Sequence, residues 1–392
     1  MLGPMIDRIQ TALAGREGAM LARIERLVLE NSHTENKAGV DRVGAMLAEL
    51  FAELPGVTTR VIPSAGGRFG AHLVASTRAA AASSEGCIAI VGHHDTVFPP
   101  GSFEGFRLDG GIARGPGVLD MKGGLVVAIE SLRVLGELGV LDAVPVRFAI
   151  VADEEVGSPE GQAILREELR GAACALVLEA GRQGDKIITA RKGTGSARVV
   201  AKGRAAHAGN AHDKGANAIW ALARFIDRAQ QITDYARGVT VNVGTVSGGE
   251  SKNTVPDHAE AKADFRFERI PDGQATFEAL REAARAAAES VPGTRVSIEG
   301  GPARVPLERS GANVALYREY AACAKAAGLG DGEAALLGGG SDASTTAAMG
   351  IPSIDGLGPR GSGFHTHEEL IEAATLAPKA AAIAAFLAAR AA

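Results

Sequence analysis

The chain contains few cysteines and few aromatic residues, and it lacks a long uncharged apolar run. Its three cysteines, Cys87, Cys174 and Cys323, lie far apart in apolar surroundings, without the spacing of a disulfide framework or a thiolate zinc site. No stretch approaches the roughly 18 uncharged residues that a membrane-spanning helix needs. We therefore expect buried cysteines, no membrane contact and a cytoplasmic protein.

An excess of basic residues is also missing. The chain has 41 Lys and Arg residues against 46 Asp and Glu residues, which gives a formal net charge of -5. Because it has no basic cluster interleaved with aromatic residues, nucleic acid is not an expected partner. The 46% apolar and 22% charged residues are typical of a globular protein, and 392 residues exceed what one core usually organises. Two domains are therefore expected.

Apolar, β-rich runs alternate with helix-like segments in the first half of the chain. The apolar runs lie at residues 87–92, 144–152 and 174–179, and helical segments lie between them at 123–139 and 160–170. This alternation predicts an α/β domain with a mainly parallel central sheet covered by helices. Open sheets of this kind hold their ligands at the C-terminal ends of the strands.

The middle of the chain has a different pattern. Residues 194–305 follow the order strand, helix, strand, strand, helix, strand, which makes a complete small ferredoxin-like domain. The α/β pattern resumes from residue 306. We therefore predict a discontinuous large domain, residues 1–193 and 306–392, interrupted by an inserted smaller one.

Several polar residues follow strands or occupy glycine-rich turns of the large domain. Each of them alone is more typical of a helix cap or an ion pair. Together they would crowd carboxylates at one sheet edge, and these would repel one another unless a cation neutralised them. The residues are His93, Asp95, Asp120, Asp153, Glu154, Glu155, Glu179 and His365.

This donor set favours a particular kind of metal. Two imidazoles with three carboxylates suit a zinc-type ion, whereas an all-oxygen set would favour magnesium or calcium. If one carboxylate is shared, five ligands can hold two ions about 3.5 to 4 Å apart. Asp120, between a Gly-Pro-Gly turn and a Gly-Gly helix start, is best placed for that bridge, and Asp95 is suited to orient His93. His94 and His367 remain alternative ligands.

The motifs of the chain resemble those of a known family. In order they are HxDTV (93–97), GxxxxDMKGG (115–124), DEE-x-GS (153–158), Glu179, AHAG (206–209), GGGSDA (338–343) and His365-Thr366. This series resembles the dizinc family of aminoacylases, glutamate carboxypeptidases and succinyl-diaminopimelate desuccinylases, most of all the bacterial folate-cleaving glutamate carboxypeptidases. The resemblance implies a zinc-peptidase-like catalytic domain at 1–193 and 306–392, and a lid or dimerisation domain at 194–305.

The resemblance also implies a role for each residue that matches a motif. Two Zn²⁺ ions would be bound, with Co²⁺ or Mn²⁺ as substitutes. Glu154 would be the general base, Asp95 would orient His93, and the Asp120-Met121 peptide bond would be cis. One zinc would take His93, Asp120 and Glu179, and the other would take Asp120, Glu155 and His365.

The inserted domain would contribute further residues, again by resemblance. His207 would reach the active site of the partner subunit in a homodimer and stabilise an oxyanion. Asn253 would bind the substrate carbonyl, and Arg266 would bind a free carboxylate, to which its planar fork is suited. Gly339 and its neighbours could present backbone amides to that carboxylate. The alternatives are an ion pair on the strand face for Arg266 and a tight turn for the glycines.

Three functional hypotheses follow. The first is a zinc metallocarboxypeptidase that releases a C-terminal residue, glutamate above all, from a peptidyl or N-acyl substrate. The second keeps this chemistry but selects the acyl group, as in an N-acyl-amino-acid deacylase or desuccinylase. The third is a metal-free or catalytically silent protein that binds a small carboxylate ligand or acts as an assembly subunit. The enzyme hypotheses take a small-molecule substrate with a free carboxylate.

Overall fold

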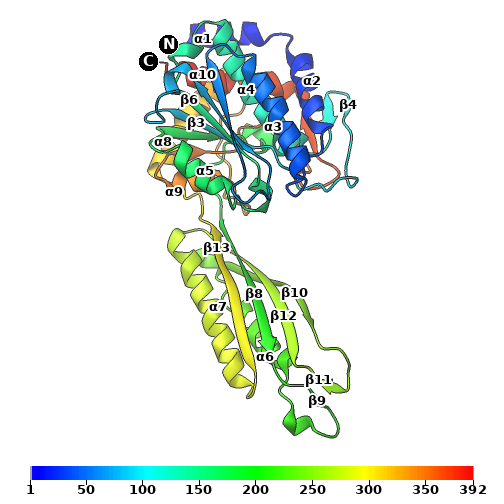
Figure 1. Ribbon diagram of the computed structural model, residues 1–392. Coiled ribbons are helices and arrows are strands. Elements are labelled where there is room, and N and C mark those ends of the chain that lie inside the picture. Colours follow the sequence, from blue (N-terminus) through cyan, green and yellow to red (C-terminus); the bar gives the residue numbers. More distant parts are fainter. Residues whose placement is uncertain (1, 392) are drawn as a thin grey trace. The chain divides into compact units, whose positions relative to one another are not determined.

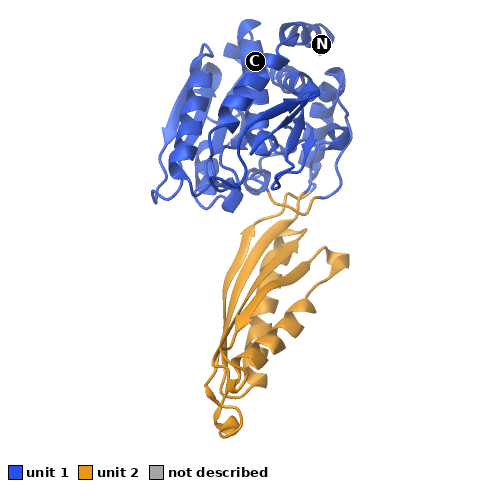
Figure 2. Cartoon of the chain, turned by 90° about the vertical axis from the view of Figure 1, so that its right-hand side faces the viewer, with its two compact units in different colours: residues 1–190, 309–336, 341–392 blue, residues 191–308, 337–340 orange. Residues whose placement is uncertain are grey.

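The computed structural model describes residues 2–391, which form two compact units, coloured separately in Figure 2. Unit 1 contains the chain up to Ala190, residues Arg309–Leu336 and the chain from Ser341 onward. Unit 2 contains Arg191–Glu308 and Leu337–Gly340. The divisions at 190 and 308 lie three residues from the expected ends at 193 and 305, whereas the return of residues 337–340 to unit 2 was not expected.

Unit 1 is built on a six-stranded sheet whose strand order is β1-β2-β6-β3-β7-β14. Figure 1 labels β3 and β6 of this sheet. β3 pairs in parallel with β6 and β7, and β14 pairs in parallel with β7, whereas β1 and β2 run antiparallel to their neighbours. The predicted α/β fold with a mainly parallel sheet is confirmed. The strands are β1 Val57–Ile62, β2 His72–Thr77, β3 Ile88–His93, β6 Val146–Val151, β7 Cys174–Val177 and β14 Ser353–Ile354.

Helices cover both faces of this sheet. All six residues of β3 are buried, since a strand covered on both faces is a nearly continuous apolar run. Ile88 and Ile90 belong to the large hydrophobic core, to which most of the helices contribute. α5 packs against β6, α9 packs against β7 and β14, and these two helices also contact each other. The helices are α1 Leu2–Leu13, α2 Glu17–Val28, α3 Lys37–Ala52, α4 Gly123–Glu137, α5 Gly161–Glu168, α8 Gly311–Ala326, α9 Ala343–Ala348 and α10 Leu376–Ala388.

A small antiparallel sheet of unit 1 carries two turns that matter for the site. Its strand order is β15-β16-β5-β4, and residues 363–369 form the loop of the β15–β16 hairpin. Leu370 of β16 pairs with Arg114 of β5, so this loop lies close to the Gly-Pro-Gly turn that follows β5. The strands are β4 Arg107–Asp109, β5 Ile112–Arg114, β15 Gly361–Ser362 and β16 Leu370–Glu372.

Unit 2 has the predicted β-α-β-β-α-β order, and its antiparallel sheet has the strand order β10-β12-β8-β13. Alternate residues of β8, among them Ala197, Val199 and Ala201, are buried under α6 and α7, as expected of a sheet with one covered face. A separate two-stranded antiparallel sheet pairs β9 with β11. The elements are β8 Gly193–Lys202, β9 Ala206–His207, α6 Ala218–Gln230, β10 Thr240–Gly248, β11 Thr254–Val255, β12 His258–Phe267, α7 Ile270–Ser290 and β13 Arg295–Arg304.

Two expectations drawn from the composition can be compared with the fold. Cys87, Cys174 and Cys323 are buried and unpaired, and burial raises the pKa of each thiol to about 11, so they are core residues as predicted. Among residues 2–391, no helix has both the length and the apolar character needed to cross a membrane.

Candidate metal centre

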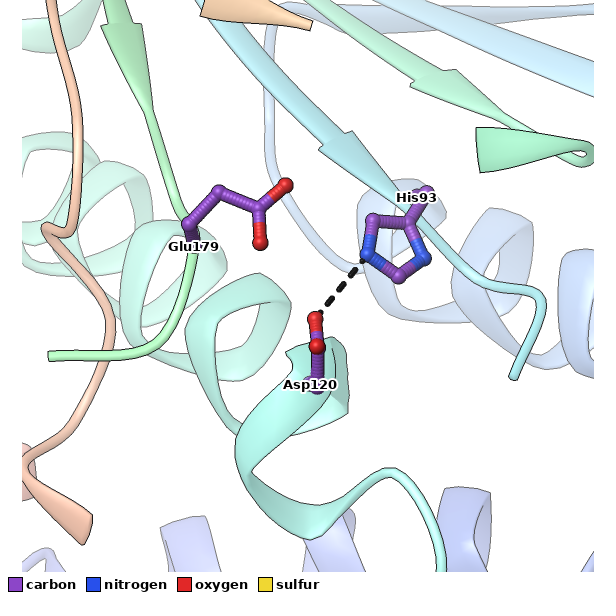
Figure 3. A group of neighbouring side chains, drawn as sticks. All are labelled: His93, Asp120 and Glu179. Atoms are coloured by element: carbon purple, nitrogen blue, oxygen red, sulfur yellow. Dashed lines mark hydrogen bonds and ion pairs between the residues drawn. The ribbon is translucent and has the colours of Figure 1, made fainter. Parts of the chain in front are cut away.

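The first cluster of ligand-type side chains lies where two neighbouring parallel strands end. His93 is the last residue of β3, and Glu179 follows β7, which pairs with β3. Asp120 approaches from the turn before α4, and its Oδ1 lies 3.2 Å from His93 Nε2. Figure 3 shows the imidazole and both carboxyl groups pointing toward one another. All three residues are buried, so their charges are poorly solvated.

Asp120 also belongs to a second cluster, with Glu155 and His365. His365 Nε2 lies 3.3 Å from Asp120 Oδ2 and 3.1 Å from Glu155 Oε2. The two carboxylate oxygens of Asp120 therefore face different imidazoles. Within each cluster the ligand atoms lie within 4.8 Å of one another. A shared carboxylate between two triads is the arrangement that two neighbouring divalent ions need.

The electrostatics of the two clusters also fit bound cations. Burial raises the pKa of Glu179 well above its ordinary value and that of Glu155 to about 8, and the charge of Asp120 adds to both shifts. Hydrogen bonds to Asp120 and Glu155 raise the pKa of His365 to about 10. Without metal, protons therefore balance the crowded carboxylates. Divalent ions would replace those protons, and the mixed imidazole and carboxylate donors suit zinc-type ions.

Metal binding should consequently release protons. Because the raised pKa values of Glu155 and His365 keep both groups protonated near pH 7, a metal ion must displace protons to bind. We expect the affinity for Zn²⁺ to increase between about pH 6 and pH 8. Calorimetry in two buffers of different ionisation enthalpy should report proton release on binding. A pH-independent affinity without proton release would contradict this assignment.

Asp95 connects the first cluster to the segment that carries Glu154 and Glu155. The backbone N–H groups of Glu154 and Glu155 donate to its two carboxylate oxygens at 3.1 and 3.2 Å, and Thr34 Oγ1 donates at 2.7 Å. His93 Nδ1 lies 3.0 Å from the backbone carbonyl of Asp95 and 3.4 Å from its carboxylate. Asp95 therefore contacts the His93 ring as expected, and it also holds the following turn in place.

The turn that presents Asp120 has an irregular backbone. Gly117 has φ 73°, and a side chain there would meet Thr96 Cγ2 at 2.6 Å. Asp120 and Met121 depart from helical geometry just before α4 begins, and the peptide bond between them is cis, as expected. The buried carboxylate of Glu369 accepts hydrogen bonds from this turn. Sequence reasoning missed Glu369, which follows His365 by four residues.

The remaining predicted residues lie in unit 2, at its two opposite ends. His207 lies in β9, and Asn253 directly precedes β11, the antiparallel partner of β9. The Ala208 N–H donates to the Asn253 carbonyl at 2.9 Å. Arg266 lies near the end of β12, eight residues beyond its start at His258, or roughly 27 Å along the strand. Unit 2 therefore does not bring His207 and Arg266 together.

Local contacts of these residues bear on their expected roles. Nδ1 of His207 accepts from two backbone N–H groups, so its neutral ring carries the proton on Nε2, which can donate. The guanidinium of Arg266 makes two 2.8 Å hydrogen bonds to Asp264, the strand-face ion pair considered above. Its Nη1 also faces the carbonyl of Gly338 at 3.4 Å, and the carbonyl of Gly339 accepts from Arg191 at 3.2 Å.

The two alternative histidines lie outside both clusters. His94 is completely buried, neither of its ring nitrogens has a hydrogen-bond partner, and burial lowers its pKa to about 4. The ring of His367 stacks on Phe103 with 5.3 Å between centroids. His94 therefore packs as a neutral core residue, and His367 packs against aromatic neighbours.

The chain is similar to several known proteins. Residues 189–292 match the family described as "Peptidase dimerisation domain". Carboxypeptidase G2 of Pseudomonas sp. (strain RS-16) is 30% identical over 358 residues, 91% of this chain and 85% of the relative. Acetylornithine deacetylase of Myxococcus xanthus is 30% identical over 200 residues, 47% of this chain and 50% of the relative.

A solved structure extends the likeness to the whole fold. The M20 family metallo-carboxypeptidase Sso-CP2 from Sulfolobus solfataricus has a TM-score of 0.72 and 18% identity, and it covers 94% of this chain and 98% of its own. With the carboxypeptidase G2 match, these findings define a metal-dependent hydrolase. The chain belongs to the M20 peptidase family.

Proposed function

We propose that this protein is a two-zinc carboxypeptidase that releases a C-terminal residue with a free carboxylate from a peptidyl or N-acyl substrate. The observation that carries the proposal is the pair of ligand triads sharing Asp120, with the charge of Glu154 acting on residues of both triads. The likeness to a carboxypeptidase supports release of a C-terminal residue. Glutamate is the proposed residue, because the motifs resemble those of bacterial glutamate carboxypeptidases. We also propose that the two bound ions are Zn²⁺ and that the protein is cytoplasmic.

The chain supplies the groups that this hydrolysis needs. Two bound ions would act as Lewis acids toward the scissile carbonyl. Glu154 would take a proton from the attacking water, whose oxygen bonds to the carbonyl carbon, and would give that proton to the amine nitrogen as the C–N bond breaks. Asp95 would hold Glu154 by its backbone N–H and His93 by its ring. The products are a carboxylate and a free amine.

Arginines around the glycine turn of unit 2 support recognition of a carboxylate. Arg191 and Arg266 contact the carbonyl groups of Gly339 and Gly338, and a side chain at Gly340 would meet Arg304 Cδ at 3.0 Å. Three guanidinium side chains therefore surround the turn, with Asp264 paired to one of them. A substrate carboxylate could take over part of the Arg266 fork, which suits bidentate binding.

Replacing Arg266 with alanine should raise KM for a glutamate-terminated peptide roughly ten- to a hundredfold, because a charge-assisted hydrogen bond is worth about 1.5–3 kcal/mol. The substitution should leave KM unchanged for the C-terminally amidated peptide, which lacks the carboxylate. Steady-state kinetics on both substrates measure this difference.

Arg198→Ala is the matched control, since Arg198 makes a similar bidentate ion pair with Glu260 in the same sheet. We expect its KM to match the unaltered enzyme. An unchanged KM for the glutamate-terminated peptide, or an equal rise in KM for both peptides, in the Arg266→Ala variant would contradict carboxylate recognition by Arg266. Acetyl- and succinyl-amino acids complete the panel, because the acetylornithine deacetylase relative favours a deacylase as the second candidate. Their preferential hydrolysis would replace the carboxypeptidase proposal.

Unit 2 also carries features that support a homodimer. β10 is an edge strand, and Val246 on it is 58% exposed, while Ile219 and Trp220 on the adjoining helix α6 are 42% and 56% exposed. Exposed apolar side chains beside an unpaired strand edge are suited to pair with a second copy. We propose that the dimer forms there and that His207 of the partner subunit donates a hydrogen bond from its Nε2–H group to the oxyanion.

A further inference from the structure

Glu369 has a fully buried carboxylate that is bound to the backbone of the Asp120 turn. Its Oε2 accepts from the Gly117 N–H at 3.1 Å, and its Oε1 accepts from the N–H groups of Leu119 and Asp120 at 2.8 and 2.9 Å. The residue is 0% exposed. One side chain therefore satisfies three backbone donors in a turn whose irregular geometry provides no helical acceptors for them.

Glu369 acts on the residue that both ligand clusters share. The loop of the β15–β16 hairpin carries His365, whose Nε2 lies 3.3 Å from Asp120 Oδ2, and Glu369, which holds the backbone N–H of Asp120. This loop thus contacts Asp120 at its carboxylate and at its backbone. The pairing of Leu370 with Arg114 fixes the loop beside the turn.

The position of Asp120 depends on the hydrogen bond from its N–H to Glu369, because the backbone of Asp120 is not part of a regular helix or strand. Asp120 has φ -119° and ψ 89°, outside the helical region. If the Glu369 carboxylate were removed, the buried N–H donors of the turn would lose their acceptor, and the turn would rearrange to find others. Each oxygen of Asp120 would then move relative to His93 and His365.

We propose that Glu369 is a positioning residue, which fixes the backbone of Asp120 so that its two carboxylate oxygens face the two metal positions. The inference rests on the proposed metal centre. Glu369 does not contact the substrate. Its contribution is to the affinity for metal and to the rate of the chemical step, and substrate binding by unit 2 is independent of it.

The test compares Glu369→Gln with Glu368→Gln in the full-length protein. Glutamine keeps the shape of the side chain, but its amide NH₂ must face backbone N–H groups in place of one carboxylate oxygen. Glu368 is the neighbouring carboxylate, with a side chain that is 85% exposed and 3.6 Å from Arg114. Affinities for Zn²⁺ and Co²⁺ are measured by competition with a chelator, together with Co²⁺ absorption spectra, kcat, KM and melting temperatures with and without metal.

For Glu369→Gln we expect a roughly ten- to hundredfold loss of metal affinity, a changed Co²⁺ spectrum and a lower kcat with KM nearly unchanged. Glu368→Gln should match the unaltered protein. A merely structural Glu369 would lower both melting temperatures equally and leave metal affinity and the Co²⁺ spectrum unchanged, and this result would overturn the inference. An unaltered protein that binds neither ion would overturn the metal centre as well.

Discussion

Replacing Glu154 with glutamine is expected to lower kcat roughly 10²- to 10⁴-fold, the usual contribution of a general base, while KM and metal content stay nearly unchanged. Glu154 lies in the turn after β6, and Asp95 accepts its backbone N–H at 3.1 Å. Its charge acts on His93, Glu155 and Glu179, so the carboxylate lies close to the centre. Glutamine has nearly the same size but cannot accept the proton of water.

Kinetics on a glutamate-terminated peptide, with metal content from elemental analysis, measure this prediction. Glu167→Gln is the control, because Glu167 is an exposed residue of the nearby helix α5. If Glu154→Gln kept normal turnover with full metal content, Glu154 would not be the base. If it lost metal together with activity, Glu154 would act on the metal positions and not on water.

Replacing Asp120 with asparagine is expected to weaken metal binding at both positions, on the order of 10²- to 10⁴-fold, because removing one partner of a buried charge cluster costs about 3–5 kcal/mol. One oxygen of Asp120 faces His93 and the other faces His365. Hydrolysis should be undetectable at metal concentrations that saturate the unaltered protein. Equilibrium dialysis with Zn²⁺ measures the number of bound ions and their affinity.

His365→Ala separates the shared ligand from a ligand of one cluster. This variant keeps His93, Asp120 and Glu179, so it should retain one tightly bound ion, whereas Asp120→Asn should retain none at the same concentration. Asp109→Asn is the control, because Asp109 is an exposed residue of β4 whose carboxylate pairs with Arg107. This variant should bind both ions normally. One tightly bound ion in both Asp120→Asn and His365→Ala would show that Asp120 is not shared.

The sequence predicted the parts of the fold whose burial pattern is strong. β3, β6 and β7 are nearly continuous apolar runs, and the strands of unit 2 alternate between buried and exposed residues. The small sheet was not predicted, because β4, β5, β15 and β16 have two or three residues each, too few to show a period. Their positions depend on pairing between distant segments.

The candidate site also contains residues that the sequence pattern indicated and residues that it did not. The sequence pointed to His93, Asp120 and Glu179 because they follow strands or glycine turns, and the structure brings these three together. Glu369 gave no such signal, since a carboxylate beside a histidine-rich turn could equally face solvent, as Glu368 does. An ion pair on the strand face was the alternative for Arg266, and the structure shows that it forms with Asp264.

The two long strands through which the chain enters and leaves unit 2 are direct neighbours, since Thr194 of β8 pairs with Arg304 of β13. Paired strands are about 4.8 Å apart, so a connection of a few residues could replace everything between them. All five candidate ligands lie in unit 1 and would stay in the shortened chain. The metal ligands are thus separable from the insert, and a shortened chain should still bind metal while lacking the proposed contributions of Arg266 and His207.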